Sequence, residues 1–417
     1  MKILFLTENF PPESNAAATR VYERACYWAR WGHEVTVITC APNFPEGRLF
    51  EGFENHWRQV ENTDGLRVVR VKTYISANRG VARRMLDFLS FMLTGFWAGL
   101  FETRPDVVVS TSPQFFAAVA GWMIGAVRRL PFVFELGDLW PASISAVGAM
   151  KPSLGLRLME KFELFLYRRA ACVVALTPEF KRNLVGRGID ADKIAVVING
   201  VDLDRYEPRP RDTDLAAEWD LTGKFVIGYV GTHGMAHALG NVLDAAERLR
   251  DADDLRILLV GAGAERDMLL AEKVRRGLDN VIMQPRQAKE MMPAIWSLCD
   301  VALVHLKDSP VFAGVIPSKI FEAMGMGKPV LLAGLEGEAS RILDADGAGV
   351  CVPAEDPDAL AEAMRELYRD AENLGALAAR SLAAAAGHSR QHQAELMIAA
   401  LEGAAQGRGG AVGDIVT

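Results

Sequence analysis

Short runs of apolar, largely β-branched residues recur along the chain and alternate with segments long enough to form helices. Nearly continuous apolar strands are typical of parallel sheets that helices cover on both faces. The pattern predicts an α/β fold with two doubly wound, Rossmann-like domains rather than one very large sheet. We predict strands at residues 3–7, 35–39, 68–73, 107–111, 132–136, 172–177 and 194–198, and then at 226–231, 256–261, 281–284, 301–306, 330–333 and 350–352.

The length of 417 residues also exceeds what one hydrophobic core usually organises. A charged, proline-containing segment follows the first set of strands at residues 202–214, and we interpret it as the linker. The expected domains are therefore residues 1–203 and 204–390. A final helix at residues 391–401 could pack back on the first domain. The Gly- and Ala-rich residues 403–417 are expected to form a flexible tail.

The composition excludes several classes of protein. Half of the residues are apolar and about a quarter are charged, as in globular proteins, and the net charge of −7 disfavours nucleic acid as a partner. The apolar run after Lys2 is too short for a secretory signal, and no uncharged apolar stretch is long enough to predict a spanning helix. The scattered cysteines are expected to be buried, reduced thiols of a cytosolic protein: Cys26, Cys40, Cys172, Cys299 and Cys351.

Polar residues after the first strand are candidate ligands, because open parallel sheets bind ligands at the carboxyl ends of their strands. The long loop after residue 7 carries Glu13 and Asn15, and small residues from Ala16 open a helix that includes Arg20. A helix that begins with small residues lets an anion approach its backbone N–H groups. We predict that this loop contacts the acceptor or a diphosphate; the alternative is an ordinary β–α loop.

Asp138 follows the fifth predicted strand within the sequence Gly137-Asp138-Leu139-Trp140-Pro141. Its carboxylate could accept a proton or bind sugar hydroxyl groups. The alternative is that Asp138 caps the next helix.

Two glycine-containing loops follow strands of the second domain. The first contains Gly231, Thr232 and His233, and we expect the His beside a phosphate. His237 lies four residues later, but no third ligand motif accompanies the two histidines, so a metal site is not predicted. The second loop contains Gly263 and resembles a dinucleotide fingerprint only in part, since Arg266 occupies the place of the third glycine.

The segment from Pro317 to Val330 is the strongest candidate site. Pro317 is suited to start a helix, and the turn at Ser318 together with Lys319 is expected to bind an anion. Glu322 lies one turn later among apolar residues, where a carboxylate needs partners such as ribose hydroxyl groups. The alternative is a structural Glu–Lys pair on a helix surface.

The sequence Pro317-Ser318-Lys319-Ile320-Phe321-Glu322-Ala323-Met324, with Gly327-Lys328-Pro329-Val330, resembles the donor-site signature of glycosyltransferase family 4. Asn199-Gly200-Val201-Asp202 is similar to a family motif between the domains. The resemblance implies the GT-B fold, in which two domains face a cleft. It also implies a retaining enzyme that uses a nucleotide-sugar donor without a required metal or other cofactor.

Within this resemblance we expect Asp138, Lys319 and Glu322 to be catalytic. The expected donor-binding residues are Gly231, Thr232, His233, Gly263, Pro317, Ser318, Lys319 and Glu322. Two features depart from the family pattern: Gly314 stands where a Glu is common, and the usual Arg/Lys pair after the first strand of the second domain is missing. This variant resembles the WbuB branch of O-antigen and capsule glycosyltransferases. The branch implies transfer of N-acetyl-L-fucosamine or a related amino sugar from a UDP-sugar.

The sequence is also compatible with two alternatives, a nucleotide-sugar 2-epimerase of the same architecture and a non-catalytic nucleotide-sugar binder. A hydride-transfer dehydrogenase is disfavoured by Arg266 in the incomplete fingerprint.

Residues 85–101 are apolar except for Asp87 and follow Arg79, Arg83 and Arg84. Arginines beside Phe, Trp and Leu are typical of a helix at an anionic membrane surface. We therefore predict a cytoplasmic protein attached peripherally to the inner face of the cell membrane, where a polyprenyl-linked acceptor would be found. The alternative is a helix buried within the domain.

Overall fold

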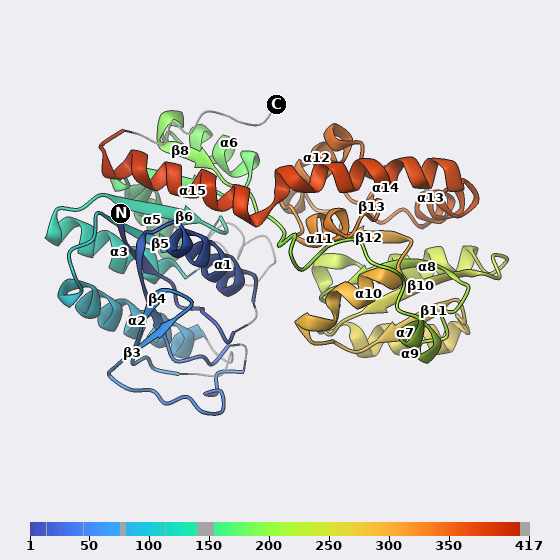
Figure 1. Ribbon diagram of the computed structural model, residues 1–417, viewed down its shortest axis with the longest axis horizontal. Helices are drawn as coiled ribbons and strands as arrows, with labels where there is room; N and C mark the ends of the chain where they lie inside the picture. Colours follow the sequence, from blue (N-terminus) through green and yellow to red (C-terminus); the bar gives the residue numbers. More distant parts are fainter. Residues whose placement is uncertain (14, 45, 76–80, 113, 140–153, 409–417) are drawn as a thin grey trace. The chain divides into compact units, whose positions relative to one another are not determined.

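A computed structural model describes the chain except for residues 14, 45, 76–80, 113, 140–153 and 409–417 (Figure 1). The chain forms two compact units, one of Met1–Asn199 with Gln393–Thr417 and the other of Gly200–His392. The first boundary lies slightly earlier than the sequence indicated, and the second slightly later. The reason is that Val201 belongs to the second unit: its N–H donates to His388 O at 2.9 Å, and Arg390 N–H donates to Val201 O at 2.7 Å.

The first unit is built on an eight-stranded sheet in the order β3-β4-β2-β1-β5-β6-β7-β8. All neighbouring strands run parallel except β3 and β4. The strands are β1 (Lys2–Leu6), β2 (Glu34–Cys40), β3 (Arg58–Thr63), β4 (Leu66–Val71), β5 (Val107–Thr111), β6 (Phe132–Leu136), β7 (Cys172–Ala175) and β8 (Ile194–Val196).

The edge strand β3 was not predicted. Its sequence Arg-Gln-Val-Glu-Asn-Thr is polar and mostly exposed, so it lacks the apolar run that marks the buried strands. It pairs with β4 through a tight turn in which Asp64 and Gly65 both have positive φ, at 52° and 81°. An Asp-Gly pair between two extended segments is typical of a β-hairpin, and this pair in the sequence could have predicted β3.

Helices cover both faces of the first sheet (Figure 1). One face packs against α1 (Ala16–Arg30) and α15 (Arg390–Ala405), and the indole N–H of Trp28 on α1 donates to Ala394 O on α15 at 3.0 Å. The opposite face packs against α2 (Val81–Phe101), α3 (Phe115–Arg128) and α5 (Leu154–Arg169). The short α6 (Pro178–Gly186) and the 3-10 turn η1 (Ala191–Lys193) precede β8.

The helix α15 extends beyond its predicted end. It continues to Ala405, so the first residues of the segment expected to be a flexible tail are helical. Ala400, Leu401 and Ala404 are buried against the first unit, which explains the extension. Residues 409–417 of the predicted tail lie outside the described residues.

The second unit contains a six-stranded, all-parallel sheet in the order β11-β10-β9-β12-β13-β14. Strands β10 and β11 extend the sheet on one side of β9, and β13 and β14 extend it on the far side of β12. The strand order therefore reverses between β9 and β12. Its strands are β9 (Phe225–Val230), β10 (Leu255–Val260), β11 (Val281–Gln284), β12 (Val301–His305), β13 (Val330–Ala333) and β14 (Gly349–Val352).

Helices also flank this sheet, and α8 and α13 pack with the core of one face. The predicted linker ends in a short helix, α7 (Thr213–Glu218). The remaining elements are η2 (Met235–His237), α8 (Gly240–Arg248), α9 (Arg266–Arg276), η3 (Lys289–Met291), α10 (Met292–Leu298), η4 (Pro310–Phe312), α11 (Lys319–Gly325), α12 (Glu338–Asp346), α13 (Pro357–Arg369), α14 (Ala371–Ala385) and η5 (Ala386–His388).

Four of the five cysteines are buried thiols, but Cys351 is exposed, so the expectation of burial was wrong for this residue. Its strand β14 lies at the edge of the second sheet, where one side of the strand has no neighbour. Within the described part of the chain, no helix combines the length and the apolar character that crossing a membrane requires.

Candidate active site

Lys319 lies at the centre of the candidate site in the second unit. Its Nζ atom is 3.6 Å from the centre of the Tyr229 ring, which belongs to β9. The nitrogen is shielded from solvent and has no hydrogen-bond partner among the described residues. Burial lowers the pKa of Lys319 to about 7, although Glu322 acts in the opposite direction. The ammonium group therefore has no hydrogen-bonded anion among the described residues, and Glu322 does not offset the effect of burial.

The loops after β9 and β10 pack backbone against backbone beside Lys319. A Cβ atom on Gly261 would collide with the carbonyl oxygen of Gly231, and one on Gly263 would collide with that of His233. The N–H of His233 donates to Ala262 O at 2.9 Å. The glycines after both strands thus allow the two loop backbones to approach closely. This packing accounts for the glycines of the incomplete fingerprint, and no bound dinucleotide is needed to explain them.

His233 is completely buried, and neither of its ring nitrogens has a partner within the described residues. Burial, with added repulsion from Arg266, Lys319 and His237, lowers the pKa of His233 to about 4. The ring is therefore neutral at physiological pH and offers one donor and one acceptor. Thr232, in contrast, is exposed, and its carbonyl oxygen accepts from the Tyr229 hydroxyl at 2.7 Å.

Two further histidines support this loop. His237 Nδ1 lies 3.3 Å from the carbonyl oxygen of His305 at the end of β12, and His305 Nε2 lies 2.8 Å from Asn241 Oδ1. These contacts give both rings structural partners. No group of three or more His, Cys, Asp or Glu residues that could hold a metal occurs in the described chain.

Glu322 lies one turn after Lys319 on α11. Its Oε2 accepts from the indole N–H of Trp296 on α10 at 3.3 Å. Burial raises the pKa of Glu322, while Trp296, Arg390 and Lys319 act in the opposite direction. The structure therefore brings together Gly231, His233, Gly263, Lys319 and Glu322 from the predicted donor-binding set.

The prediction that Pro317 starts the helix was wrong. The helix α11 begins at Lys319 with Ser318 as its N-cap, and the Ser318 side chain makes no capping bond. The carbonyl groups of Pro317 and Ser318 accept from the N–H groups of Ile320 and Phe321 at 3.1 Å each. Pro317 therefore precedes the cap, and the positive charge of this turn resides in Lys319.

In the first unit, Arg20 is held by a buried carboxylate. Its Nε lies 3.2 Å from Glu135 Oε1, and the Nη1 of Arg24 lies 2.6 Å from the same oxygen. Desolvation opposes ionisation of Glu135, but the two arginines and a bond to Thr111 lower its pKa overall. Arg20 thus has a structural partner at the carboxyl end of β6.

Asp138 lies two residues beyond β6 and is half-buried. The preceding Gly137 donates its N–H to Ser112 Oγ at 2.9 Å, which ties this turn to the end of β5. Asp138 also contributes to the raised pKa of the buried Tyr167. The alternative role, in which Asp138 caps the next helix, concerns residues 140–153, which lie outside the described residues.

The loop after β1 uses two of its predicted ligands internally. Glu13 is buried, and its carboxylate accepts from Asn9 Nδ2 at 2.7 Å and from the N–H groups of Asn43 and Phe44 at 2.8 and 2.9 Å. Asn15 caps α1, where its Oδ1 accepts from Ala18 N–H at 2.9 Å. Ala16 is the exposed first residue of that helix.

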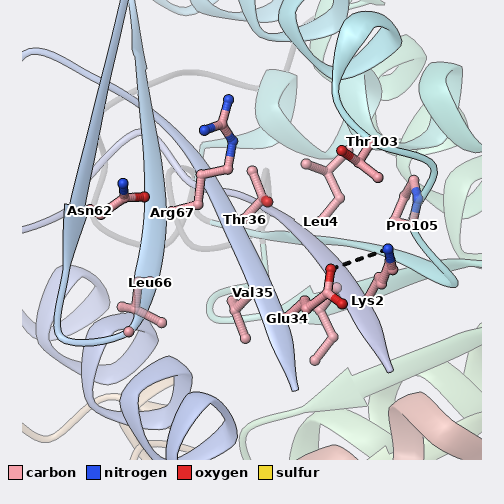
Figure 2. Close-up of a pocket in the computed structure, with 12 residues that line it drawn as sticks. Lys2, Leu4, Glu34, Val35, Thr36, Asn62, Leu66, Arg67, Thr103 and Pro105 are labelled. Atoms are coloured by element: carbon pink, nitrogen blue, oxygen red, sulfur yellow. Dashed lines mark ion pairs between the residues drawn. The ribbon is translucent and has the colours of Figure 1, made fainter. Parts of the chain in front are cut away.

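An open hollow of about 410 Å³ lies elsewhere on the first unit. Figure 2 shows that its walls come from the amino ends of β1, β2 and β4, with an ion pair of 3.2 Å between Lys2 and Glu34. Ligands of open parallel sheets bind at the carboxyl ends of the strands. This hollow is at the opposite edge and is not the candidate site.

Sequence reasoning missed several residues of the sites. Tyr229 and Trp296 lie in apolar runs that read as core, and only their contacts with Lys319 and Glu322 reveal another role. Glu8 lies two residues beyond the end of β1, and Asp87 is the one charge in the apolar run of α2. Their positions were visible in the sequence, but their burial was not.

The chain matches two family profiles. "Glycosyl transferase 4-like domain" matches residues 15–200, and "Glycosyl transferases group 1" matches residues 224–370. The chain is 26% identical over 377 residues to WcaI of Escherichia coli, which is assigned as a colanic acid biosynthesis glycosyl transferase; 88% of this chain and 92% of WcaI are covered. It is 30% identical to the D-inositol 3-phosphate glycosyltransferase of Nocardia farcinica over 68% of this chain and 64% of that protein.

Solved structures show the same architecture. Sucrose-phosphate synthase of Thermosynechococcus elongatus superposes with a TM-score of 0.76 at 17% identity, covering 95% of this chain and 97% of that one. Anabaena HepE, solved in complex with UDP-glucose, gives 0.71 at 20% identity and covers 96% and 99%. The two matched profiles span most of the chain, and both sheets have the doubly wound order expected for this fold. The chain therefore belongs to the family 4 glycosyltransferases of GT-B fold.

Proposed function

We propose that this enzyme is a retaining glycosyltransferase that moves a sugar from a UDP-sugar to a polyprenyl-linked or saccharide acceptor during assembly of a surface polysaccharide. The name of WcaI, which refers to colanic acid biosynthesis, supports a role in polysaccharide assembly. The complexes of HepE with UDP and UDP-glucose support a uridine nucleotide as donor. N-acetyl-L-fucosamine or a related amino sugar remains the proposed sugar, on the resemblance to the WbuB branch.

The unpartnered Nζ of Lys319 is the observation that carries this proposal. A cation buried without a partner is costly, and the diphosphate of a nucleotide sugar would supply the missing anion. Negative charge grows on the diphosphate as the bond to the anomeric carbon breaks. A lysine at that position stabilises the transition state more than the ground state.

Glu322 is proposed to bind the donor ribose. Its Oε2 accepts from Trp296, which fixes the carboxylate, and the other oxygen can accept from ribose hydroxyl groups. His233 is proposed to lie beside the phosphates, where its neutral ring can donate one hydrogen bond. Gly231 and Gly263 provide the close backbone approach, and Thr232, Pro317 and Ser318 complete the donor-binding set.

The proposed reaction breaks the bond between the anomeric carbon and the diphosphate and forms a bond to an acceptor hydroxyl oxygen on the same face. The proton of that hydroxyl passes to the leaving phosphate. Asp138 would then orient the acceptor or the sugar, and we assign it this role rather than that of an obligatory base. No metal is required in this scheme, because Lys319 offsets the charge of the leaving group.

The helix α2 is proposed to contact an anionic membrane. Its inner face is buried against the sheet and α3, where Phe91 is fully buried and Gly99 packs closely on Ile124. The opposite face exposes a stripe of large apolar side chains at helical spacing, which we call the α2 stripe. It consists of Leu86, Leu93, Trp97 and Phe101, which are 54%, 53%, 57% and 79% exposed.

Basic residues precede the α2 stripe. Arg83 and Arg84 are exposed in the first turn of α2, and the Arg84 guanidinium lies 5.6 Å from the centre of the Phe88 ring. Arg79, the third predicted arginine, lies outside the described residues. Apolar and cationic side chains at one end of a helix suit the boundary between headgroups and acyl chains. Attachment there would place the enzyme on the inner face of the membrane, beside a polyprenyl-linked acceptor.

The test is a panel of UDP-, GDP- and dTDP-sugars, each assayed for release of nucleoside diphosphate with and without polyprenyl-linked saccharide from a membrane extract. We expect acceptor-stimulated release with at least one UDP-sugar, and unchanged turnover in EDTA. Release of GDP or dTDP alone would contradict the proposed donor. Loss of turnover in EDTA would contradict the metal-free mechanism, and no stimulation by acceptor with any donor would contradict the transfer function.

A further inference from the structure

Two buried carboxyl groups lie at the carboxyl end of β1 in the first unit. Glu8 follows β1, and Asp87 comes from the inner face of α2; only 7% of Glu8 and 8% of Asp87 are exposed. Oε2 of Glu8 and Oδ1 of Asp87 are shielded from solvent, and neither has a hydrogen-bond partner in the described part of the chain. Buried polar atoms are seldom left without partners, so these two oxygens call for an explanation.

The neighbours of these carboxyl groups do not neutralise them. Burial raises the pKa of Glu8 well above its usual value, and Asp87 and Glu13 raise it further, while Arg84 lowers it. Burial raises the pKa of Asp87 to about 7, with Arg84 opposing and Glu13 adding to the shift. The environment therefore favours the neutral form of both groups, and a neutral carboxyl group can both donate and accept hydrogen bonds.

The pair lies where the first sheet reverses its strand order. The strands β2 and β5 flank β1, and ligands of doubly wound sheets bind outside the carboxyl ends at this reversal. Across the same point, Gln114 from the loop after β5 donates its Nε2–H to Asn9 Oδ1, and its Oε1 atom also lacks a partner among the described residues. Three elements thus contribute oxygens without partners among the described residues near this end of the sheet.

The chemistry of these groups selects the ligand. A diphosphate is bound by cationic groups and N–H donors, and two carboxyl groups supply no positive charge to it. A metal ion is not favoured either, since no group of three potential ligands occurs in the described residues. Neutral hydroxyl groups suit carboxyl groups whose neutral form is favoured, because each hydroxyl can both donate and accept.

We propose that Glu8 and Asp87 bind hydroxyl groups of the acceptor saccharide and so form an acceptor subsite. This inference rests on the proposed transferase function and names the acceptor chemistry that it requires. It places Asp87 and the α2 stripe on one helix, with Leu86 of the stripe next to Asp87 in the chain. A saccharide bound at Asp87 would therefore lie close to the surface that we propose meets the membrane, as a lipid-linked acceptor requires.

Saturation-transfer NMR with octyl glycosides of glucose, galactose and N-acetylglucosamine tests the subsite, with the ligands kept below their micellar concentration and UDP present. The variants are Glu8→Gln and Asp87→Asn, which keep the shape of each side chain. The control is Glu34→Gln, an exposed carboxylate at the opposite edge of the same sheet. We expect sugar-ring protons to be saturated by the wild type and the control, and the ring signal to fall at least fivefold in both variants.

A ring signal that is absent from the wild type for all three glycosides, or unchanged in either variant, would overturn the subsite. Calorimetric titration of the same samples with UDP separates this failure from that of the proposed function. If UDP binds but the ring signal is the same in the variants as in the wild type, only the subsite is refuted. If UDP does not bind, the donor site on which the proposed function depends is refuted. Thermal unfolding of each variant shows that the comparison is made between folded proteins.

Discussion

The ammonium nitrogen of Lys319 lies 3.6 Å above the ring of Tyr229, and among the described residues it has no hydrogen-bond partner. An aromatic face attracts a cation, but it cannot supply the hydrogen bonds that an ammonium group makes with an anion. The contact holds the side chain against the loop after β9, where a Cβ atom on Gly231 would lie 2.7 Å from Nζ. This geometry leads to the first two predictions.

Lys319→Met should lower kcat more than it weakens donor binding. The methionine keeps the packing on Tyr229 but removes the charge that stabilises the leaving diphosphate. Removing one such group costs about 100-fold in kcat, and we expect the donor Kd to change less than tenfold. Steady-state kinetics at saturating donor measure the effect, with Lys273→Met on α9 as control. Equal kcat in Lys319→Met and the wild type would refute the assigned role.

Donor binding should weaken as the pH rises above 7. Burial lowers the pKa of Lys319 to about 7, so the free enzyme loses this charge above that pH and must take up a proton to bind the diphosphate. Affinity should then fall as the pH rises, and the total fall should stay within the limit of about tenfold expected for Lys319→Met. His233 and His237, whose pKa values are about 4, do not titrate in this range. Calorimetry of UDP at pH 8 in two buffers of different ionisation enthalpy should report proton uptake in the wild type and none in Lys319→Met.

Asp87→Asn should stabilise the protein at alkaline pH. The pKa of Asp87 is raised to about 7 in the folded state, from 3.8. A raised pKa means that the fold binds the proton more tightly, so stability is lost as the pH rises from about 4 through 7. Asparagine does not ionise, and the gain at pH 8 is expected to be on the order of 1–3 kcal/mol. Urea unfolding at pH 8 and at pH 5 measures the free energy of unfolding of the variant and the wild type. An equally large gain in stability at pH 5 would show that titration of Asp87 is not its cause.

The α2 stripe and its arginines should carry binding to anionic membranes. The wild type is expected to float with anionic liposomes at low salt. Charge reversal of Arg79, Arg83 and Arg84 should abolish flotation, since each basic residue near such a surface contributes about 1 kcal/mol. Trp97→Ser with Phe101→Ser should weaken it by removing apolar contact. Reversal of Lys181 and Arg182 on α6 is the control, and flotation of all variants alike would exclude α2 as the contact.

The buried strands could be predicted because continuous apolar runs have few other uses in a chain of this composition. The edge strand β3 escaped, since an exposed strand needs no apolar run. The first-domain ligands were harder to predict because the same residue types also build loops. Asn15 is equally suited to cap a helix, and the structure uses it in that way.

The donor segment was recognisable because Lys319 and Glu322 follow a family pattern in consecutive residues. Their partners Tyr229 and Trp296 come from other elements and have the apolar character of core residues. Asp87 shows the same limit. Its charge stands out in the sequence, but its proximity to Glu8 depends on how α2 packs against the loop after β1. Such relationships arise only when the chain is folded.

Titration of UDP into the wild type and Glu322→Ala tests the donor site most directly. The account predicts one UDP site per chain in the wild type. Loss of the hydrogen bonds that a charged group makes to the ribose costs about 1.5–3 kcal/mol, or roughly tenfold to more than a hundredfold in Kd. Glu372→Ala, an exposed position on α14 of the same unit, should bind like the wild type. Equal UDP affinity in a folded Glu322→Ala protein would contradict the account, as would a wild type that does not bind UDP.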